Sequence, residues 1–145
     1  MKNIKLGVIL FFILFVLPFG CSDSEDSPIP TVYVNFTINP ASIQYNNLNI
    51  PGNYATLNGG YRGIIVFHFI QDQYIAYERT CTFDSEKACS KLIVDNSGLI
   101  AEDTCCGSKF LLTDGSPLEG SPATRALKRY NTSYDAYHSL LHIYN

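Results

Sequence analysis

Residues 31–38, TVYVNFTI, alternate apolar and polar side chains at every step, and this pattern restricts what the segment can form. In an extended chain one face would carry four apolar side chains: Val32, Val34, Phe36 and Ile38. The opposite face would carry Tyr33, Asn35 and Thr37. A period of two residues is typical of a β-strand that is buried on one face only. The segment is therefore predicted to be a half-buried strand.

Residues 58–79 are predicted to form a more deeply buried hairpin. A glycine-rich turn leads into an unbroken apolar run that starts at Ile64, and such a run suggests a strand buried on both faces. After Asp72, the sequence QYIAYER supplies the second strand. Further short strands are expected in four segments separated by turn sequences: KLIVD, LIAED, SKFLLT and HSLLHIY.

The fold class follows from these strands. No segment has a sustained helical period with capping residues, so long helices are not expected. The 10 tyrosines and 9 phenylalanines suit a small β core that relies on aromatic side chains. We therefore predict one all-β domain over residues 31–145, either a small sandwich or a partly open barrel of antiparallel sheets.

The first 20 residues are predicted to be an export signal. Two lysines precede an apolar run over residues 6–19, which is followed by Gly20 and Cys21. A run of about 14 apolar residues is shorter than the ~20 that a spanning helix needs. The ending LPFGC resembles the lipobox of bacterial lipoproteins, although Pro18 and Phe19 depart from its commonest form. The resemblance implies cleavage before Cys21 and lipid attachment to it; an ordinary secretion signal is the alternative.

Residues 21–30, CSDSEDSPIP, are acidic, polar and proline-bearing, and this composition predicts a disordered tether. A run of serine and acidic residues directly after the lipidated cysteine resembles the export tag of Bacteroidetes surface lipoproteins. These two resemblances imply a bacterial cell-envelope protein that its lipid anchors to the outer membrane. Exposure on the cell surface is a further expectation.

Charge and cysteine content limit the partners. The formal net charge is −3, and loss of Lys2 and Lys5 with the signal makes it −5. Because no basic patch remains, nucleic acid is not expected to bind.

The cysteine count predicts disulfides. With Cys21 lipidated, four cysteines remain in an exported chain, and this even number predicts a disulfide framework with three alternative pairings. These cysteines are Cys81, Cys89, Cys105 and Cys106.

The sequence lacks the common signatures of catalysis. It has no His-Glu-x-x-His, Gly-x-Ser-x-Gly, Gly-x-x-x-x-Gly-Lys or Cys-x-x-Cys motif. His68 lies within the apolar run, and we expect a structural role for it. His138 and His142 lie four residues apart in a predicted strand, roughly 13 Å, which is too far for one metal ion. No catalytic residue is assigned, and an enzymatic role is not favoured.

Several short motifs, taken in order, resemble a Rieske domain. The segments AYERTCTF and DTCCGSKF are followed by an Asp-Gly turn, a Gly-Ser-Pro-Ala stretch and an aromatic residue. Matching positions are Gly107, Ser108, Phe110, Asp114, Gly115, Gly120, Pro122 and Ala123. The resemblance covers about half of the chain after the signal. It implies the Rieske fold, in which the loops containing CTF and DTCCGS lie side by side.

The ligand positions of that family are largely changed here. A Rieske domain holds a two-iron two-sulfur cluster with two cysteines and two histidines. Cys81 stands at the first cysteine position, but Phe83 stands at the first histidine position. Asp103 occupies the second cysteine position and Cys106 the second histidine position. Phe83 cannot ligate iron, so the resemblance implies a scaffold that has lost its usual cluster.

The resemblance also implies a disulfide between the two loops. Many Rieske domains carry such a bridge, and Cys105 and Cys89 can take its two places if the loop FDSEKAC is longer than usual. Cys81 and Cys106 would then face each other and form a second bridge in an oxidising compartment. The pairing stays open, because the loop that carries Cys89 could reach either Cys105 or Cys106.

Two functions follow from these observations. The first is a non-catalytic structural or interaction module on the membrane, without metal or cofactor and with an unknown protein or glycan partner. The alternative is a redox or metal-binding protein that holds zinc or an iron–sulfur cluster, since thiolates favour both. Its ligands would be Cys81, Cys105 and Cys106, together with Asp103 or Cys89.

Overall fold

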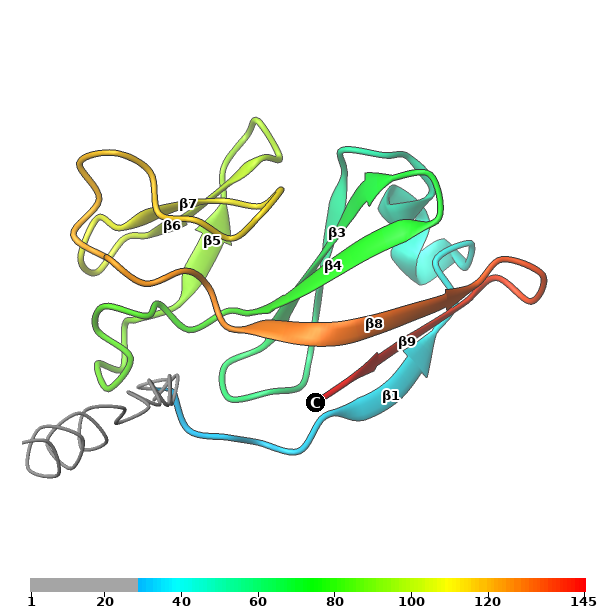
Figure 1. Ribbon diagram of the computed structural model, residues 1–145, viewed down its shortest axis with the longest axis horizontal. Helices are drawn as coiled ribbons and strands as arrows, with labels where there is room; N and C mark the ends of the chain where they lie inside the picture. The colour runs from blue at the N-terminus through cyan, green and yellow to red at the C-terminus, as the bar shows by residue number, and fades with distance from the viewer. Residues whose placement is uncertain (1–28) are drawn as a thin grey trace, which may run out of the picture.

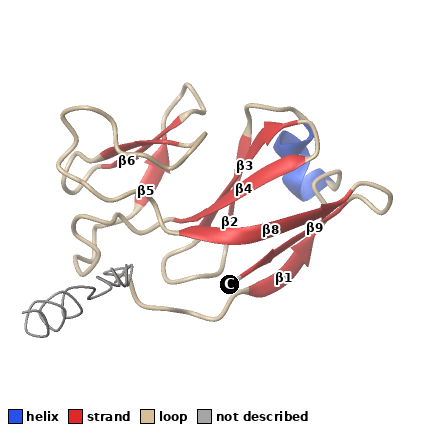
Figure 2. Ribbon diagram, viewed as in Figure 1, coloured by secondary structure: helices blue, strands red, loops and turns tan. Residues whose placement is uncertain are grey.

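A computed structural model describes residues 29–145, so the signal, Cys21 and most of the tether lie outside the described residues. Within this range the strands are β1 (Asn35–Ile38), β2 (Tyr54–Leu57), β3 (Ile64–Ile70), β4 (Gln73–Glu78), β5 (Leu92–Val94), β6 (Ile100–Asp103), β7 (Lys109–Leu111), β8 (Arg129–Asp135) and β9 (Leu140–Tyr144). One 3₁₀-helix, η1 (Ile43–Asn49), is the helical element of this part of the chain (Figure 2). In residues 29–145 no helix is long and apolar enough to cross a membrane. The prediction of an all-β fold is confirmed.

The strands form two antiparallel sheets. The larger sheet has the order β1-β9-β8-β4-β3-β2, and the smaller has the order β5-β6-β7. Figure 1 shows the larger sheet curving into a half-barrel, with the smaller sheet and its long loops at the left, beside one end of the β3–β4 hairpin. This arrangement confirms the expected partly open barrel of antiparallel sheets.

The β3–β4 hairpin lies between two hydrophobic cores. Ile65 and Phe67 of β3 pack with residues of the smaller sheet, among them Leu92 and Phe110. Ile64 and Val66 point the other way and pack inside the half-barrel, in the cluster that contains Leu141 and Ile143. Since successive strand residues face opposite sides, an unbroken apolar run is what a strand between two cores requires. The predicted burial of β3 on both faces is confirmed.

The alternation in residues 31–38 is also confirmed. Val34 and Ile38 are buried, whereas Tyr33, Asn35 and Thr37 are exposed. The hydrogen-bonded strand is shorter than the pattern, because β1 pairs with β9 only from Asn35 onward. Ile29, near the predicted end of the tether, is 2% exposed.

Tyr77 of β4 allows a first prediction about stability. Its side chain is fully buried, and its hydroxyl has no hydrogen-bond partner among the described residues. Burial also raises the pKa of Tyr77 to about 12. An unpaired buried hydroxyl is unfavourable, so Tyr77→Phe should leave the free energy of unfolding unchanged or raise it by up to about 1 kcal/mol.

Urea denaturation of the Tyr77→Phe variant measures this change. Tyr130→Phe is the matched control, because the Tyr130 hydroxyl donates a 2.7 Å hydrogen bond to the buried Glu78 carboxylate. Loss of that bond should lower stability by about 1 to 3 kcal/mol. Clear destabilisation by Tyr77→Phe would show that its hydroxyl has a partner.

Candidate functional site

Two loops at one end of the smaller sheet carry the positions singled out by the sequence. The first loop, residues 79–91, runs from β4 to β5, and the second, residues 104–108, joins β6 to β7. Both lie at the left of Figure 1. The second loop closes with a 2.7 Å hydrogen bond from the Gly107 N–H to the Asp103 carbonyl. Gly107 has a φ of +77°, a conformation that glycine adopts without strain, and this explains the glycine after Cys106.

A disulfide joins the two loops. Cys89 of the first loop is bonded to Cys105 of the second, with their Cα atoms 5.6 Å apart. The structure therefore contains the loop-to-loop bridge that the family resemblance implied. Because both cysteines are bonded, neither is available as a thiolate ligand. Of the metal ligands expected from the sequence, Cys81, Cys106 and Asp103 remain.

Three other side chains come together here: Cys81 of the first loop, Cys106 of the second loop, and Asp103 at the end of β6. The ligand atoms of Cys81, Asp103 and Cys106 all lie within 4.8 Å of one another. The Sγ atoms of Cys81 and Cys106 are 3.6 Å apart, and the Sγ of Cys106 is 3.4 Å from the Asp103 Oδ2. Phe83, at the first histidine position of the Rieske resemblance, is 54% exposed and has no side-chain atom that can ligate a metal.

The expected second disulfide, Cys81–Cys106, is not formed in the structure. Both residues are free thiols, with a sulfur-to-sulfur distance well beyond the ~2.05 Å of a bond. The two sulfur atoms nevertheless face each other as the sequence analysis expected. A bridge between them in oxidised protein stays a prediction.

Asp103 is held in place by its neighbours. Its side chain is 0% exposed, and its Oδ1 accepts a 2.8 Å hydrogen bond from the Cys105 N–H. Its Oδ2 accepts a 3.3 Å hydrogen bond from the Ser90 hydroxyl and lies near the Cys106 thiol. Among residues 29–145 no basic side chain forms an ion pair with this carboxylate. It is therefore an acidic group buried next to two thiols, with Lys87 acting on it electrostatically but not in contact.

The two thiols differ in their surroundings. Burial raises the pKa of Cys81 to about 12, although hydrogen bonds from the backbone N–H groups of Phe83 and Asp84 act in the opposite direction. Cys81 is thus a protonated thiol at neutral pH. Cys106 is only partly buried, and its Sγ lies 3.0 Å from the Ser108 hydroxyl oxygen.

Sequence reasoning missed the two serines of this site. Ser108 is fully buried and also accepts a 3.1 Å hydrogen bond from the Ala123 N–H. The Gly-Ser motif matches this position to the Rieske family but does not predict the contact of Ser108 with Cys106. Ser90 carries no local signal, because its contact with Asp103 joins residues that meet only when the loops pack together.

The histidines take no part in the site. His68 lies in β3 and stacks on Tyr74 at a ring-centroid distance of 4.3 Å. His138 lies in the β8–β9 turn and pairs with Asp135 at 2.6 Å, and His142 of β9 contacts Asn35 at 2.7 Å. His68 and His142 belong to strands of the larger sheet, and His138 to the turn that joins two of its strands, so none of the three lies in the two loops.

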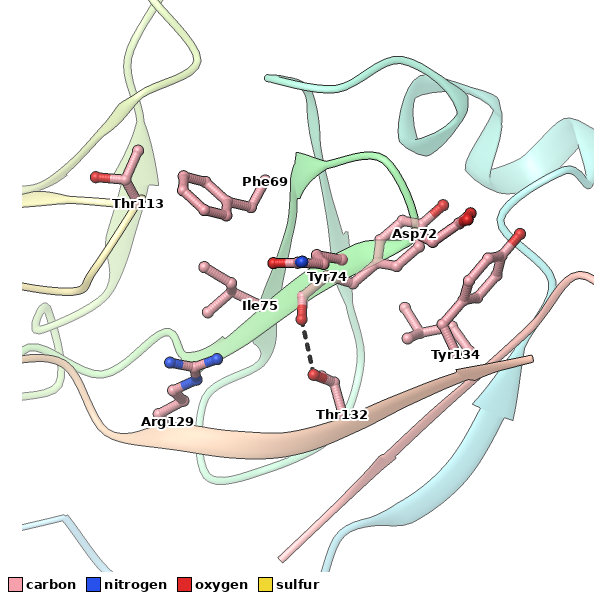
Figure 3. A pocket seen from close by; sticks show the side chains of 10 residues that line it. Phe69, Asp72, Tyr74, Ile75, Thr113, Arg129, Thr132 and Tyr134 are labelled. Atoms are coloured by element: carbon pink, nitrogen blue, oxygen red, sulfur yellow. Dashed lines mark hydrogen bonds between the residues drawn. The ribbon is translucent and has the colours of Figure 1, made fainter. Parts of the chain in front are cut away.

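A cavity of about 420 Å³ lies elsewhere, between β4 and β8. Figure 3 shows Tyr74, Thr132 and Tyr134 around it, with the Thr132 hydroxyl donating a 2.7 Å hydrogen bond to the Tyr74 carbonyl. Arg129 and Asp72 also line it. Its lining contains no cysteine or histidine. The two free thiols of the described residues, Cys81 and Cys106, lie at the two loops instead.

The sequence matches no protein-family model and no curated protein. Among solved structures, the plasma membrane Rieske protein of the cyanobacterium Synechocystis PCC 6803 superimposes with a TM-score of 0.53. The match covers 79% of this chain and 100% of that chain, at 21% identity. The fold is Rieske-like.

Two further solved structures match with lower scores. The complex of reduced oxygenase and oxidized ferredoxin in carbazole 1,9a-dioxygenase gives a TM-score of 0.48 at 20% identity, covering 79% of this chain and 94% of that chain. The Escherichia coli protein NirD gives 0.45 at 14% identity, covering 80% and 98%. At such low sequence identities a structural similarity shows the fold alone and does not assign a function to this chain.

Proposed function

We propose that this chain is a lipid-anchored cell-envelope protein whose Rieske-like domain has lost its cluster ligands and acts as a non-catalytic structural or interaction module. The observation that carries the proposal is the composition of the two loops. A Rieske cluster needs two imidazoles on one iron, and in the described residues none of the three histidines lies in these loops. Phe83 is exposed where one imidazole would be needed, so the residues present do not fit that cluster.

The disulfide supports a structural role for the loops. Without a cluster to join them, residues 79–91 and 104–108 need another connection. The Cys89–Cys105 bridge supplies it, and a bridge of this loop length contributes about 3 kcal/mol to the stability of a small domain. The loops can therefore keep a Rieske-like arrangement without iron.

The location rests on the sequence of the first 30 residues. Lipid on Cys21 would hold the protein on the outer membrane. Residues 21–30, of which Ile29 is buried, would form a tether that presents the domain, residues 31–145, at the cell surface. The membrane would then be one partner. A protein or glycan would be the second partner of the module, and its net negative charge disfavours nucleic acid.

Replacing Cys21 with alanine tests the anchor. Incorporation of labelled palmitate should fall to background, because the acylated sulfur is gone, and the protein should leave the outer-membrane fraction. Ser22→Ala is the control and should be labelled like the wild type. Labelling that persists in Cys21→Ala would contradict the anchor.

Restoring the ligands tests the loss of the cluster. The triple variant Phe83→His, Asp103→Cys, Cys106→His should show the visible and electron paramagnetic resonance spectra of a Rieske cluster after treatment with iron and sulfide. The wild-type protein should show neither under the same conditions. A Rieske-type spectrum from wild-type protein isolated from its native host would refute the proposal.

A metal-binding function is the second candidate, and one observation favours it. Cys81, Asp103 and Cys106 bring three potential ligand atoms within 4.8 Å of one another. An iron–sulfur cluster held by these residues would need a fourth ligand from outside the group, since Cys89 and Cys105 are bonded to each other. A single ion makes no such demand, because water can complete its coordination.

A further inference from the structure

We propose that Cys81, Asp103 and Cys106 form a site for one thiophilic divalent cation of the Zn²⁺ class, with a fourth coordination position open to water or an external ligand. The inference specifies the ion and the coordination of the second candidate function, on which it rests, and does not depend on the proposed module function. It is carried by three features of the two loops: the distances between the ligand atoms, the buried carboxylate, and the hydrogen bonds that orient it.

The distances match a tetrahedral ion. With Zn–S bonds of ~2.3 Å and a Zn–O bond of ~2.1 Å, tetrahedral geometry separates two sulfur ligands by about 3.8 Å and a sulfur from an oxygen by about 3.6 Å. The corresponding distances are 3.6 Å for Cys81 to Cys106 and 3.4 Å for Cys106 to Asp103. The third separation, between the Cys81 Sγ and an Asp103 carboxylate oxygen, is at most 4.8 Å. Two of the three separations therefore match the ion closely, and the third must close to about 3.6 Å when the ion binds.

The buried carboxylate gives a reason for a cation. Buried charged groups in proteins are paired with an opposite charge or coordinate a metal, because burial removes their hydration. Asp103 is fully buried and has no ion pair within residues 29–145. Lys87 interacts electrostatically with Asp103 but forms no ion pair with it. A divalent ion between Asp103 and the two sulfur atoms would place a positive charge in direct contact with the carboxylate.

The surrounding hydrogen bonds fix the ligands in position. The Cys105 N–H holds the Asp103 Oδ1, and the Ser90 hydroxyl reaches the Oδ2. The Ser108 hydroxyl contacts the Cys106 sulfur. Such partners orient metal ligands and are part of a working site. The Cys89–Cys105 bridge keeps both loops together and uses the two cysteines that are not in the ligand set.

The site reaches the surface at Cys106. This residue is only partly buried, whereas Cys81 and Asp103 are buried. An ion can therefore enter from the surface. Since the chain offers three ligands, a water molecule or an external donor would complete a tetrahedron, as in zinc sites that keep an open position.

The test is metal titration of the full chain, purified in detergent without oxygen so that the Cys81 and Cys106 thiols stay reduced and the Cys89–Cys105 bridge stays intact. One equivalent of Zn²⁺ should bind per chain and protect two thiols from alkylation. Co²⁺ should give the visible absorption of a tetrahedral thiolate site, and added Zn²⁺ should remove it. The X-ray absorption spectrum of the bound Zn²⁺ should show two sulfur neighbours at about 2.3 Å and two oxygen neighbours at about 2.0 to 2.2 Å.

Variants identify the ligands. Cys106→Ser and Asp103→Asn should each weaken Zn²⁺ binding by more than the ~10-fold to 100-fold that follows loss of an outer-shell partner. Glu102→Gln and Cys21→Ser are the matched controls, because they remove a neighbouring acid and another cysteine, and both should bind Zn²⁺ like the wild type. Circular dichroism and mapping of the Cys89–Cys105 bridge show whether each variant is folded.

Two results would overturn the inference. The first is the absence of a one-to-one Zn²⁺ complex in reduced wild-type protein. The second is an X-ray absorption spectrum without two sulfur neighbours, which needs no variant and so holds even where Cys106→Ser does not fold. Neither result would touch the proposed module function, which the Cys21→Ala and triple-variant experiments test separately.

Discussion

Replacing Glu78 with alanine is expected to destabilise the folded domain by about 3 to 5 kcal/mol, which is a large part of the stability of a domain of this size. Glu78 is the last residue of β4, and its carboxylate is fully buried. It accepts hydrogen bonds from five donors: the N–H groups of Tyr61, Arg62 and Thr80, and the hydroxyls of Thr80 and Tyr130. Alanine would leave several buried donors without an acceptor.

This hydrogen-bond network also explains a glycine. Gly60 has a φ of +61°, and a Cβ atom there would overlap the Glu78 carboxylate and the Tyr130 hydroxyl. The turn before β3 can therefore wrap around the carboxylate only because residue 60 has no side chain. Thr80 lies in the first loop and directly precedes Cys81, so its hydrogen bond to Glu78 links the network to the candidate site.

Urea denaturation measures the effect of Glu78→Ala, with Glu102→Ala as the control. Glu102 lies on β6, where its partly exposed carboxylate is 3.5 Å from Lys109. Its loss should change stability by less than about 1 kcal/mol. The Cys81 thiol should also react faster with alkylating reagents in Glu78→Ala, because the preceding residue is released. A destabilisation no larger than that of Glu102→Ala would contradict the role assigned to Glu78.

Removing the Cys89–Cys105 bridge is expected to lower the free energy of unfolding by about 3 kcal/mol, as the chain-entropy relation gives for a sequence separation of 16 residues. The variant is Cys89→Ser with Cys105→Ser. Its loops would be free to separate, so Cys81, Asp103 and Cys106 would be held together less firmly.

Thermal and urea unfolding with and without reductant measure this contribution. Reductant should destabilise the wild-type protein toward the level of the double variant. The double variant is its own control, because reductant should leave its stability almost unchanged. Equal stability of the wild type and the double variant would show that the bridge does not constrain the loops.

The strands with strong local patterns were predictable from the sequence. The alternation around Val34 and Ile38 and the apolar run of β3 determine which side chains can be buried, whatever the chain packs against. The β3–β4 hairpin follows for the same reason, because its two apolar segments are separated only by a short turn at Asp72. The order of the Rieske-like motifs then predicted that the two loops would lie together.

Two strands and the 3₁₀-helix were not predicted. β8, RYNTSYD, buries only Tyr130 fully, so its hydrophobic pattern is too weak to identify a strand. Its backbone is held instead by hydrogen bonds to β9 over five paired positions and to β4 over two. β2 is short and lies at the edge of the larger sheet. Such strands are stabilised by partners distant in the sequence.

The candidate site was likewise predictable from the sequence only in part. The sequence by itself determined which chemistry the loops can offer, because Phe83 cannot ligate iron and because cysteine and aspartate can bind a thiophilic ion. Only the tertiary structure decided among the possible cysteine pairings in favour of Cys89–Cys105, left Cys81 and Cys106 as thiols, and buried Asp103 beside them. The physical reason is that these contacts join segments distant in the sequence, and their geometry depends on how residues 79–91 pack against the β6–β7 hairpin, which no local pattern of residues encodes.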